Sequence, residues 1–133
     1  MSKPLRVVFV CVENSCRSQM AQGFARALGG NAVEAYSAGS RPSGKVNATA
    51  IQVMAELGPA FAIDHHASKS LADLPPVDFD AAVTMGCGDA CPMLRCKRRV
   101  DWQIPDPKHM PLEEFRQVRD RIRTEVQQLL ASL

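Results

Sequence analysis

Buried-type apolar runs alternate with segments of helical spacing along the chain. Val7–Val12 is a continuous, mostly β-branched run, which is typical of a strand buried on both faces of a parallel sheet. Apolar residues then recur at helical spacing from Met20 to Leu28, and Gly29-Gly30 marks the end of that segment. The first 30 residues are therefore predicted to form a strand followed by a helix.

The same alternation continues to the end of the chain. Residues 32–37 and 79–85 indicate two more strands, and residues 100–104 indicate a weaker fourth. A helix is predicted to end at Gly58-Pro59. The last segment predicts the clearest helix, because one apolar stripe faces a side rich in Arg and Glu. The stripe consists of Leu112, Phe115, Val118, Ile122, Val126, Leu129 and Leu130.

This order of elements predicts an α/β fold. Right-handed βαβ units give a doubly wound parallel sheet of four strands with helices on both faces. Ligands in such folds bind beyond the carboxyl ends of the strands. The segments after Val12, after Met85 and after Ile104 are therefore expected to converge on one site.

Length and composition restrict the class of protein. The chain of 133 residues is 46% apolar and 23% charged, which suits one soluble domain over residues 1–133. A net charge of +2 is too weak to indicate a nucleic-acid or membrane partner. The longest apolar run is far shorter than the ~20 residues of a membrane span, and no secretory signal is recognisable. We expect a cytoplasmic monomer that binds neither nucleic acid nor membrane.

Five cysteines add candidate chemistry. Cys11 and Cys16 lie near the N-terminus, and Cys87, Cys91 and Cys96 fall within ten residues. Because the cytoplasm keeps thiols reduced, such clusters indicate catalysis or metal binding more than structural disulfides. For any single cysteine, a place in the core is an equal alternative.

The segment between the first strand and the first helix has the features of an oxyanion-binding loop. Cys11 is followed after five residues by Arg17 and Ser18. Loop N–H groups and the helix N-terminus attract a tetrahedral anion, and an arginine can bind two of its oxygens. The same positive field favours a thiolate, so Cys11 is predicted to be the nucleophile with Ser18 bonded to its sulfur. The predicted oxyanion-binding residues are Val12, Glu13, Asn14, Ser15, Cys16, Arg17 and Ser18. The alternative is a buried strand-end cysteine beside a solvated arginine.

Residues 10–21, Val-Cys-Val-Glu-Asn-Ser-Cys-Arg-Ser-Gln-Met-Ala, resemble the active-site loop of arsenate reductases built on the low-molecular-weight protein tyrosine phosphatase fold. The resemblance covers nearly the whole chain and continues at Tyr36-Ser37-Ala38-Gly39, Val83-Thr84-Met85, Asp101-Trp102 and Asp106-Pro107. It implies a four-stranded parallel sheet flanked by helices, arsenate or phosphate as the bound oxyanion, no cofactor, and a role in arsenical resistance.

Asp106 matches the general acid of that family. An oxygen that leaves arsenic or phosphorus must be protonated, and a carboxyl group beyond the fourth strand can reach it. A turn aspartate before a proline is the alternative.

The resemblance further implies a relay of thiols. Cys11 attacks arsenate while Asp106 assists the loss of hydroxide. Cys87 then attacks Cys11 and expels arsenite. Finally Cys91 attacks Cys87 and moves the disulfide outward to an external reductant. Cys96 is the other cysteine able to take this last role.

The electron donor and a phosphatase activity are open points. Thioredoxin is the first hypothesis, but Cys87 and Cys91 stand closer in sequence than is usual in thioredoxin-coupled members. Their Gly-Cys-Gly-Asp-x-Cys-Pro form resembles members linked to a small thiol such as mycothiol, and glutathione is a further alternative. Phosphatases of this fold carry tyrosines after the Asp-Pro, where this chain has Lys108-His109-Met110. A dedicated tyrosine phosphatase is therefore disfavoured, although the loop is compatible with weak phosphatase activity.

Two groups of residues are compatible with a metal site, but we expect no metal. Asn14, Ser37 and Asp64 match the potassium site of some family members, but Gln22 replaces a glutamate and removes a charge. A zinc module is the rival from another functional class, although C-x3-C-x4-C is not a usual zinc spacing. Its candidate ligands are Cys87, Cys91 and Cys96 with His65, His66 or His109, and these histidines are expected at the surface.

Overall fold

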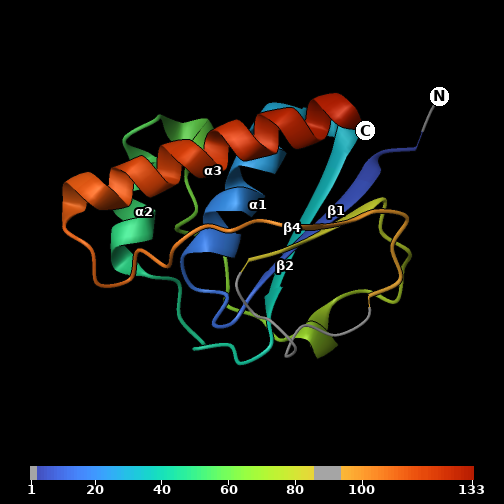
Figure 1. Ribbon diagram of the computed structural model, residues 1–133, viewed down its shortest axis with the longest axis horizontal. Coiled ribbons are helices and arrows are strands. Elements are labelled where there is room, and N and C mark those ends of the chain that lie inside the picture. Colours follow the sequence, from blue (N-terminus) through green and yellow to red (C-terminus); the bar gives the residue numbers. More distant parts are fainter. Residues whose placement is uncertain (1–2, 86–93) are drawn as a thin grey trace.

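The computed structural model describes residues 3–85 and 94–133. Within them, four parallel strands form one sheet in the order β2-β1-β3-β4 (Figure 1). The strands are β1 (Leu5–Cys11), β2 (Val33–Gly39), β3 (Ala81–Thr84) and β4 (Arg99–Asp101). The helices are α1 (Arg17–Gly29), α2 (Ala48–Ala55) and α3 (Leu112–Ser132), with short 3₁₀ turns η1 (Gly30–Ala32), η2 (Pro59–Phe61) and η3 (Leu71–Asp73). The predicted single-domain α/β fold is confirmed.

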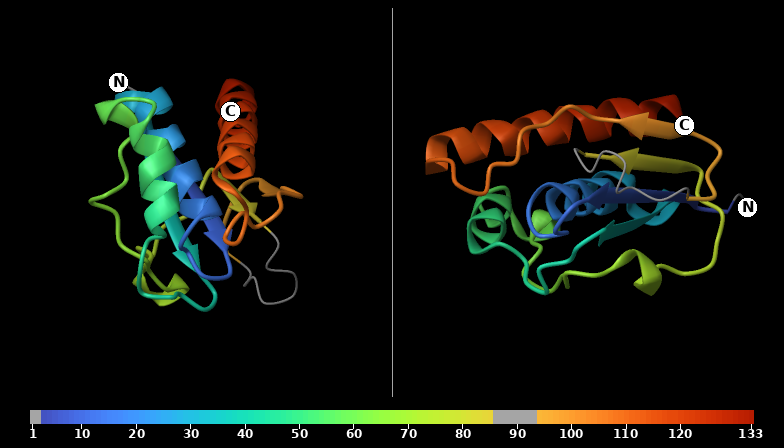
Figure 2. Two further views of the ribbon diagram at one scale, coloured as in Figure 1. Left: turned by 90° about the vertical axis from the view of Figure 1, so that its left-hand side faces the viewer. Right: turned by 60° about the horizontal axis from the view of Figure 1, so that its bottom comes forward.

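Strand β1 lies at the centre of the sheet and buries both of its faces. Val7, Phe9 and Cys11 pack into the larger core with the helices, whereas Val8 and Val10 pack into a smaller cluster on the other face. The three helices pack against one another and therefore share one face of the sheet (Figure 2). In the described parts of the chain, η3 and its flanking segments cover the other face of the sheet. The helix that was expected on that face is not found among the described residues.

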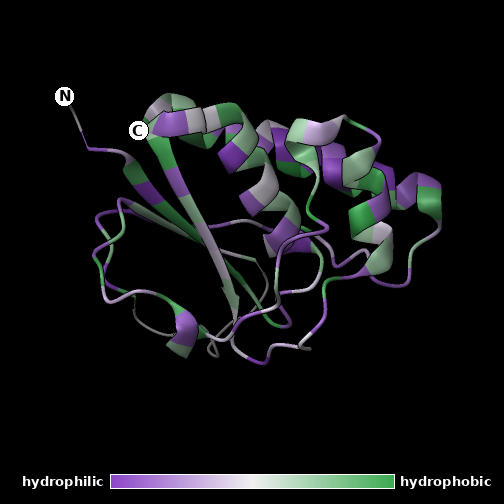
Figure 3. Cartoon of the chain, turned by 180° about the vertical axis from the view of Figure 1, so that it is seen from behind, coloured by the Kyte–Doolittle hydropathy of each residue, from purple (hydrophilic) through white to green (hydrophobic). Residues whose placement is uncertain are grey.

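The predicted stripe along α3 is largely confirmed. Phe115, Val118, Ile122, Val126 and Leu129 are buried, and the helix carries alternating hydrophobic and hydrophilic bands in Figure 3. Leu112 is exposed, because the first turn of the helix extends past the core. No helix in the described parts of the chain is long and apolar enough to cross a bilayer.

Strands β1 and β4 end earlier than predicted at their carboxyl ends. β1 ends at Cys11 rather than at residue 12, because the Val12 carbonyl turns out of the sheet and accepts the Arg41 N–H at 2.8 Å. β4 ends at Asp101 rather than at residue 104. Trp102 still donates its N–H to the Thr84 carbonyl at 2.9 Å, but the Ile104 carbonyl accepts from the Arg17 side chain at 3.0 Å. Both strands therefore stop where the chain turns to other partners.

Gly39 allows the end of β2 to pass close under the loop that follows β1. A Cβ atom at this position would lie 2.6 Å from the Val12 carbonyl oxygen and 2.9 Å from the Asn14 nitrogen. These are backbone atoms, which cannot rotate away as the end of a side chain can. The contact therefore requires glycine and sets the distance between β2 and the loop.

We expect Gly39→Ala to lower the free energy of unfolding by about 1–3 kcal/mol, the usual cost of overpacking. Gly23→Ala in α1 is the matched control. Its Cβ would meet the Ile63 and Met54 side chains, which can shift, and alanine gains about 1 kcal/mol of helix propensity over glycine. Urea unfolding of both variants measures the difference. A larger loss for Gly23→Ala than for Gly39→Ala would contradict this account of the loop.

Candidate active site

The start of α1 leaves its backbone donors available to a ligand. Its N-cap residue is Cys16, which makes no side-chain capping bond, and its first turn contains no acidic residue. In α2, by contrast, the Asn47 side chain accepts the N–H groups of Thr49 and Ala50. The first N–H groups of a helix carry a partial positive charge. An uncapped helix that begins at the carboxyl end of a central strand is suited to bind an anion.

The loop between β1 and α1 turns its carbonyl groups away from this helix start. The Val12, Glu13 and Ser15 carbonyls accept backbone N–H groups from the segment 41–47 at 2.8, 3.0 and 3.0 Å. No hydrogen bond donated by the N–H groups of residues 13–16 is found within the described parts of the chain. The carbonyl groups of the loop are thus hydrogen-bonded on its outer side, and its N–H groups remain available on the inner side. We name residues 11–18 the oxyanion cradle.

Asn14 fixes the shape of the cradle from inside the protein. Its backbone has a φ of 50°, a left-handed conformation that asparagine tolerates better than most residues. Its Oδ1 accepts the Lys69 N–H at 2.7 Å and the Gln19 Nε2–H at 2.9 Å. Its Nδ2 donates to the Ser18 hydroxyl at 2.8 Å. Both polar atoms of this fully buried side chain are therefore hydrogen-bonded within the protein.

The Cys11 sulfur lies at the bottom of the cradle and contacts Ser18, as predicted. The two side-chain atoms are 2.8 Å apart and both residues are buried. The Ser18 oxygen accepts from Asn14 and can also donate its hydrogen, so once the Cys11 sulfur is ionised the Ser18 hydroxyl is the donor of this pair. A donor aimed at a sulfur stabilises its thiolate form.

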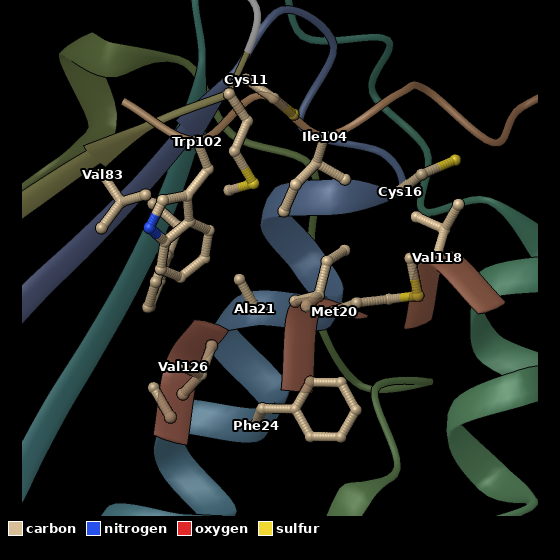
Figure 4. Close-up of a cluster of buried hydrophobic side chains, with 14 of the residues drawn as sticks. Cys11, Cys16, Met20, Ala21, Phe24, Val83, Trp102, Ile104, Val118 and Val126 are labelled. Atoms are coloured by element: carbon tan, nitrogen blue, oxygen red, sulfur yellow. The ribbon is translucent and has the colours of Figure 1, made fainter. Parts of the chain in front are cut away.

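Cys16 has a different environment from Cys11. Burial raises the pKa of the Cys16 thiol to about 12, with further contributions from the nearby charges of Asp106 and Cys11. Cys16 therefore stays protonated at neutral pH and can serve the loop only as a thiol. Figure 4 shows both cysteines at one end of the main core cluster, together with Ile104 and Trp102. Both are free thiols.

Arg17 joins the cradle to the segment that follows β4. Its guanidinium donates to the Ile104 carbonyl at 3.0 Å and lies 3.9 Å from the Asp106 carboxylate. The Arg17 side chain is 10% exposed and that of Asp106 is 45% exposed, so the arginine is held in place while the carboxyl group reaches solvent. Asp106 lines a small cavity of about 20 Å³ with six residues of the cradle, Cys11, Val12, Glu13, Ser15, Cys16 and Arg17. The predicted convergence of the segments after β1 and β4 is confirmed.

The predicted third segment leaves the sheet beside the same site. Met85 donates its N–H to the Val10 carbonyl at 2.8 Å, next to the end of β1. Cys87 and Cys91, the predicted relay cysteines, lie outside the described residues. Cys96 is described and lies at the opposite end of the sheet, where it bridges to Phe79. The geometry therefore brings together Cys11, Arg17, Ser18 and Asp106, and Cys96 is not among them.

The described residues of the two metal hypotheses have other partners or lie apart, whereas Cys87 and Cys91 lie outside the described residues. Ser37 donates to the Gln22 side-chain oxygen, and the Asn14 side chain is bonded to Ser18, Gln19 and the Lys69 N–H. The Asp64 side chain is 73% exposed and pairs with His65. No group of three His, Cys, Asp or Glu side chains placed to hold a metal occurs within residues 3–85 and 94–133.

Several residues that support the cradle were not found from the sequence. Gln19 is fully buried, and its Nε2 donates to Asn14 and to the Ala67 carbonyl. Its Oε1 therefore accepts, at 2.9 Å, from Nδ1 of His66. The prediction of a surface position for His66 is wrong, because the ring is half-buried, whereas His65 and His109 are exposed as expected. The resemblance motif contains Gln19, but no local pattern links it to a histidine 47 residues away.

Comparisons with known proteins agree with this geometry. The family model described as low molecular weight phosphotyrosine protein phosphatase matches residues 6–133. The glutaredoxin arsenate reductase of Synechocystis sp. is 37% identical over 131 residues, which cover 96% of this chain and 98% of that protein. A solved arsenate reductase in the phosphate binding state has a TM-score of 0.87 at 37% identity and covers 96% of this chain and 98% of its own. The thioredoxin-dependent arsenate reductase of Corynebacterium glutamicum has a TM-score of 0.75 at 30% identity, over all of this chain and 66% of its own.

The environment of His66 predicts how stability depends on pH. Burial, followed by the charges of Arg26, His65 and Lys69, lowers the pKa of His66 from 6.5 to about 3. Between these values the unfolded chain binds a proton that the folded chain does not. The contribution of His66 to stability is therefore constant above pH 6.5 and is lost as the pH falls from 6.5 towards 3, by at most about 1.4 kcal/mol per pH unit.

We expect His66→Asn, which keeps a donor for Gln19, to flatten this dependence. Urea unfolding at pH 7, 6 and 5 measures the free energy of unfolding, and the gap between wild type and variant should change in favour of the variant as the pH falls. The exposed His109→Asn is the control and should run parallel to wild type. Parallel curves for His66→Asn would show that the ring titrates alike in both states.

Proposed function

The chain belongs to the low molecular weight phosphotyrosine protein phosphatase family and is an arsenate reductase, and we propose that it reduces arsenate with Cys11 as the nucleophile of the oxyanion cradle. One observation carries this proposal. The loop around the buried Cys11 sulfur has its carbonyls hydrogen-bonded on the outside, leads into an uncapped helix, and holds the Ser18 hydroxyl 2.8 Å from the sulfur. Such a site holds a tetrahedral anion against a thiolate.

In the first step the Cys11 thiolate attacks the arsenic of arsenate. The cradle N–H groups and Arg17 bind the remaining oxygens and stabilise the negative charge that develops on them. A sulfur–arsenic bond forms and an arsenic–oxygen bond breaks, while Asp106 donates a proton so that the oxygen leaves as water. The position of Asp106 in the lining of the same cavity as Cys11 supports this role.

The reduction itself needs two further thiols, and we assign them to Cys87 and Cys91. The Cys87 thiolate attacks the Cys11 sulfur and forms a disulfide. The sulfur–arsenic bond breaks and its electron pair stays on arsenic, which leaves as arsenite. Cys91 then attacks Cys87, so that the disulfide moves to Cys87–Cys91 and Cys11 is released as a thiolate. The start of this segment beside β1, at Met85, supports its access to the cradle.

An external reductant must reduce the Cys87–Cys91 disulfide, and we propose cytoplasmic thioredoxin as the donor. The likeness to a thioredoxin-dependent arsenate reductase supports this choice. The name of the Synechocystis relative points to glutaredoxin instead. The short spacing of the two cysteines keeps a small thiol such as mycothiol as the alternative.

Arsenite release from arsenate tests the proposal. Reduced enzyme is supplied with thioredoxin and its reductase, with glutathione and glutaredoxin, or with mycothiol and its cognate redoxin. We expect sustained release in at least one system and none from Cys11→Ser, because a hydroxyl cannot replace the thiolate. Phosphate ester hydrolysis is measured in parallel. Normal arsenite release by Cys11→Ser, or ester hydrolysis without any arsenite release by wild type, would reject the assignment.

The relay predicts a different defect for each cysteine. Cys91→Ser should release about one arsenite per enzyme and stop, with Cys11 and Cys87 joined in the peptide map, because the disulfide has no exit. Cys87→Ser should release none unless a small thiol attacks the Cys11–arsenate adduct in place of Cys87. Cys96→Ser is the matched control and should turn over normally, since Cys96 lies at the far end of the sheet. If Cys91→Ser turns over with mycothiol but not with thioredoxin, the small-thiol route replaces the relay.

A further inference from the structure

The oxyanion cradle, which we propose to bind an anion, contains an acidic side chain. Glu13 lies in the loop between Cys11 and Arg17, and it lines the same cavity. An unpaired carboxylate at this position would repel arsenate, which is itself an anion. The structure shows how this charge is compensated.

Lys108 pairs with Glu13, which lines the cavity. Its ammonium contacts both carboxylate oxygens of Glu13, at 2.9 and 3.0 Å, although the two residues are 95 positions apart in the chain. The hydrogen bond to Glu13 and the charge of Glu13 raise the pKa of Lys108, with smaller contributions from Asp106 and Cys16.

The backbone of Lys108 holds Asp106 at the same time. The Lys108 N–H donates to the Asp106 carboxylate at 3.1 Å. One residue thus connects Glu13, on the loop of the nucleophile, to Asp106, on the loop of the acid. Since the Glu13 and Lys108 side chains are 36% and 42% exposed, the ion pair contributes little to folding stability. The position of the ion pair between the two loops points to a role in the site rather than in folding stability.

We propose that Glu13 and Lys108 are positioning residues, which tie the loop of Asp106 to the oxyanion cradle and so hold the acid over the bound anion. The inference rests on the proposed function, since it concerns the same reaction. Glu13 anchors Lys108, Lys108 orients Asp106, and the positive charge of Lys108 cancels the repulsion that Glu13 would exert on arsenate. Neither residue donates the proton itself.

The other contacts between the two loops explain why this pair is needed. In the described parts of the chain, polar contacts between residues 11–18 and 104–108 come from Arg17 and from the Glu13–Lys108 pair. The Arg17 guanidinium is also the side chain that binds the anion in the proposed function. Once it turns to the anion, its 3.9 Å contact with Asp106 weakens. Besides the Arg17 bond to the Ile104 carbonyl, the Glu13–Lys108 pair then links the loop of Asp106 to the cradle among the described residues.

A single turnover of reduced enzyme with arsenate tests the inference, because arsenite is then released before an external reductant is needed. We expect the maximal rate to fall roughly tenfold in Lys108→Met and in Glu13→Gln, within the range that misplaced catalytic groups cost. The arsenate concentration for half-maximal rate should rise about threefold in Lys108→Met only, because Glu13 is then unpaired. The charge-swapped double variant Glu13→Lys with Lys108→Glu restores the pair and should recover most of the rate.

A double-mutant cycle shows whether the pair acts through Asp106. In an Asp106→Asn background, Lys108→Met should cause no further loss of the maximal rate. The exposed ion pair of Arg95 with Asp78, also 2.9 Å long, is the matched control, and Arg95→Met should behave as wild type. An unchanged rate in Lys108→Met, or a full loss added to that of Asp106→Asn, overturns the inference. Absence of arsenite release from wild type overturns the proposed function instead.

Discussion

The site depends on the outward bonding of the loop that joins β1 to α1. The carbonyls of Val12, Glu13 and Ser15 are taken by the segment 41–47, and this leaves the donors of the same peptides for the inner side. Gly39 makes the arrangement possible, because any side chain there would push β2 away from the loop. The oxyanion binding and the activation of Cys11 that we propose both depend on this one constraint on the backbone.

Burial of polar groups makes the arrangement rigid. Asn14, Ser18 and Gln19 are fully buried, and Asn14 is hydrogen-bonded to both of the others. His66 is hydrogen-bonded to Gln19 at the outer end of this network. A buried polar group that loses its partner costs about 1–3 kcal/mol, so each member holds the next in place. The cradle is therefore formed before an anion arrives, which is the condition under which fixed dipoles stabilise a developing charge most effectively.

The elements of the fold could be predicted from the sequence because their signals are local. The apolar run of β1 and the apolar stripe of α3 can each be recognised from a short stretch of sequence. The cradle can be recognised from the Cys11–Ser18 segment. The strand ends at Cys11 and Asp101 could not be predicted, since they depend on where Val12 and Ile104 find distant partners. Contacts such as Gln19 with His66 and Glu13 with Lys108 join residues 47 and 95 positions apart, and no periodicity encodes them.

The most direct test of the cradle is an amide-resolved titration of the reduced protein with inorganic phosphate, which resembles arsenate in shape and charge but is not reduced. Proton–nitrogen correlation spectra report each backbone N–H separately. The account predicts that the largest shifts fall on the amides of residues 13–18 and on the Arg17 side chain, and that they saturate together as one site. Largest shifts at the exposed basic residues 97–99, with the cradle amides unmoved, would contradict it.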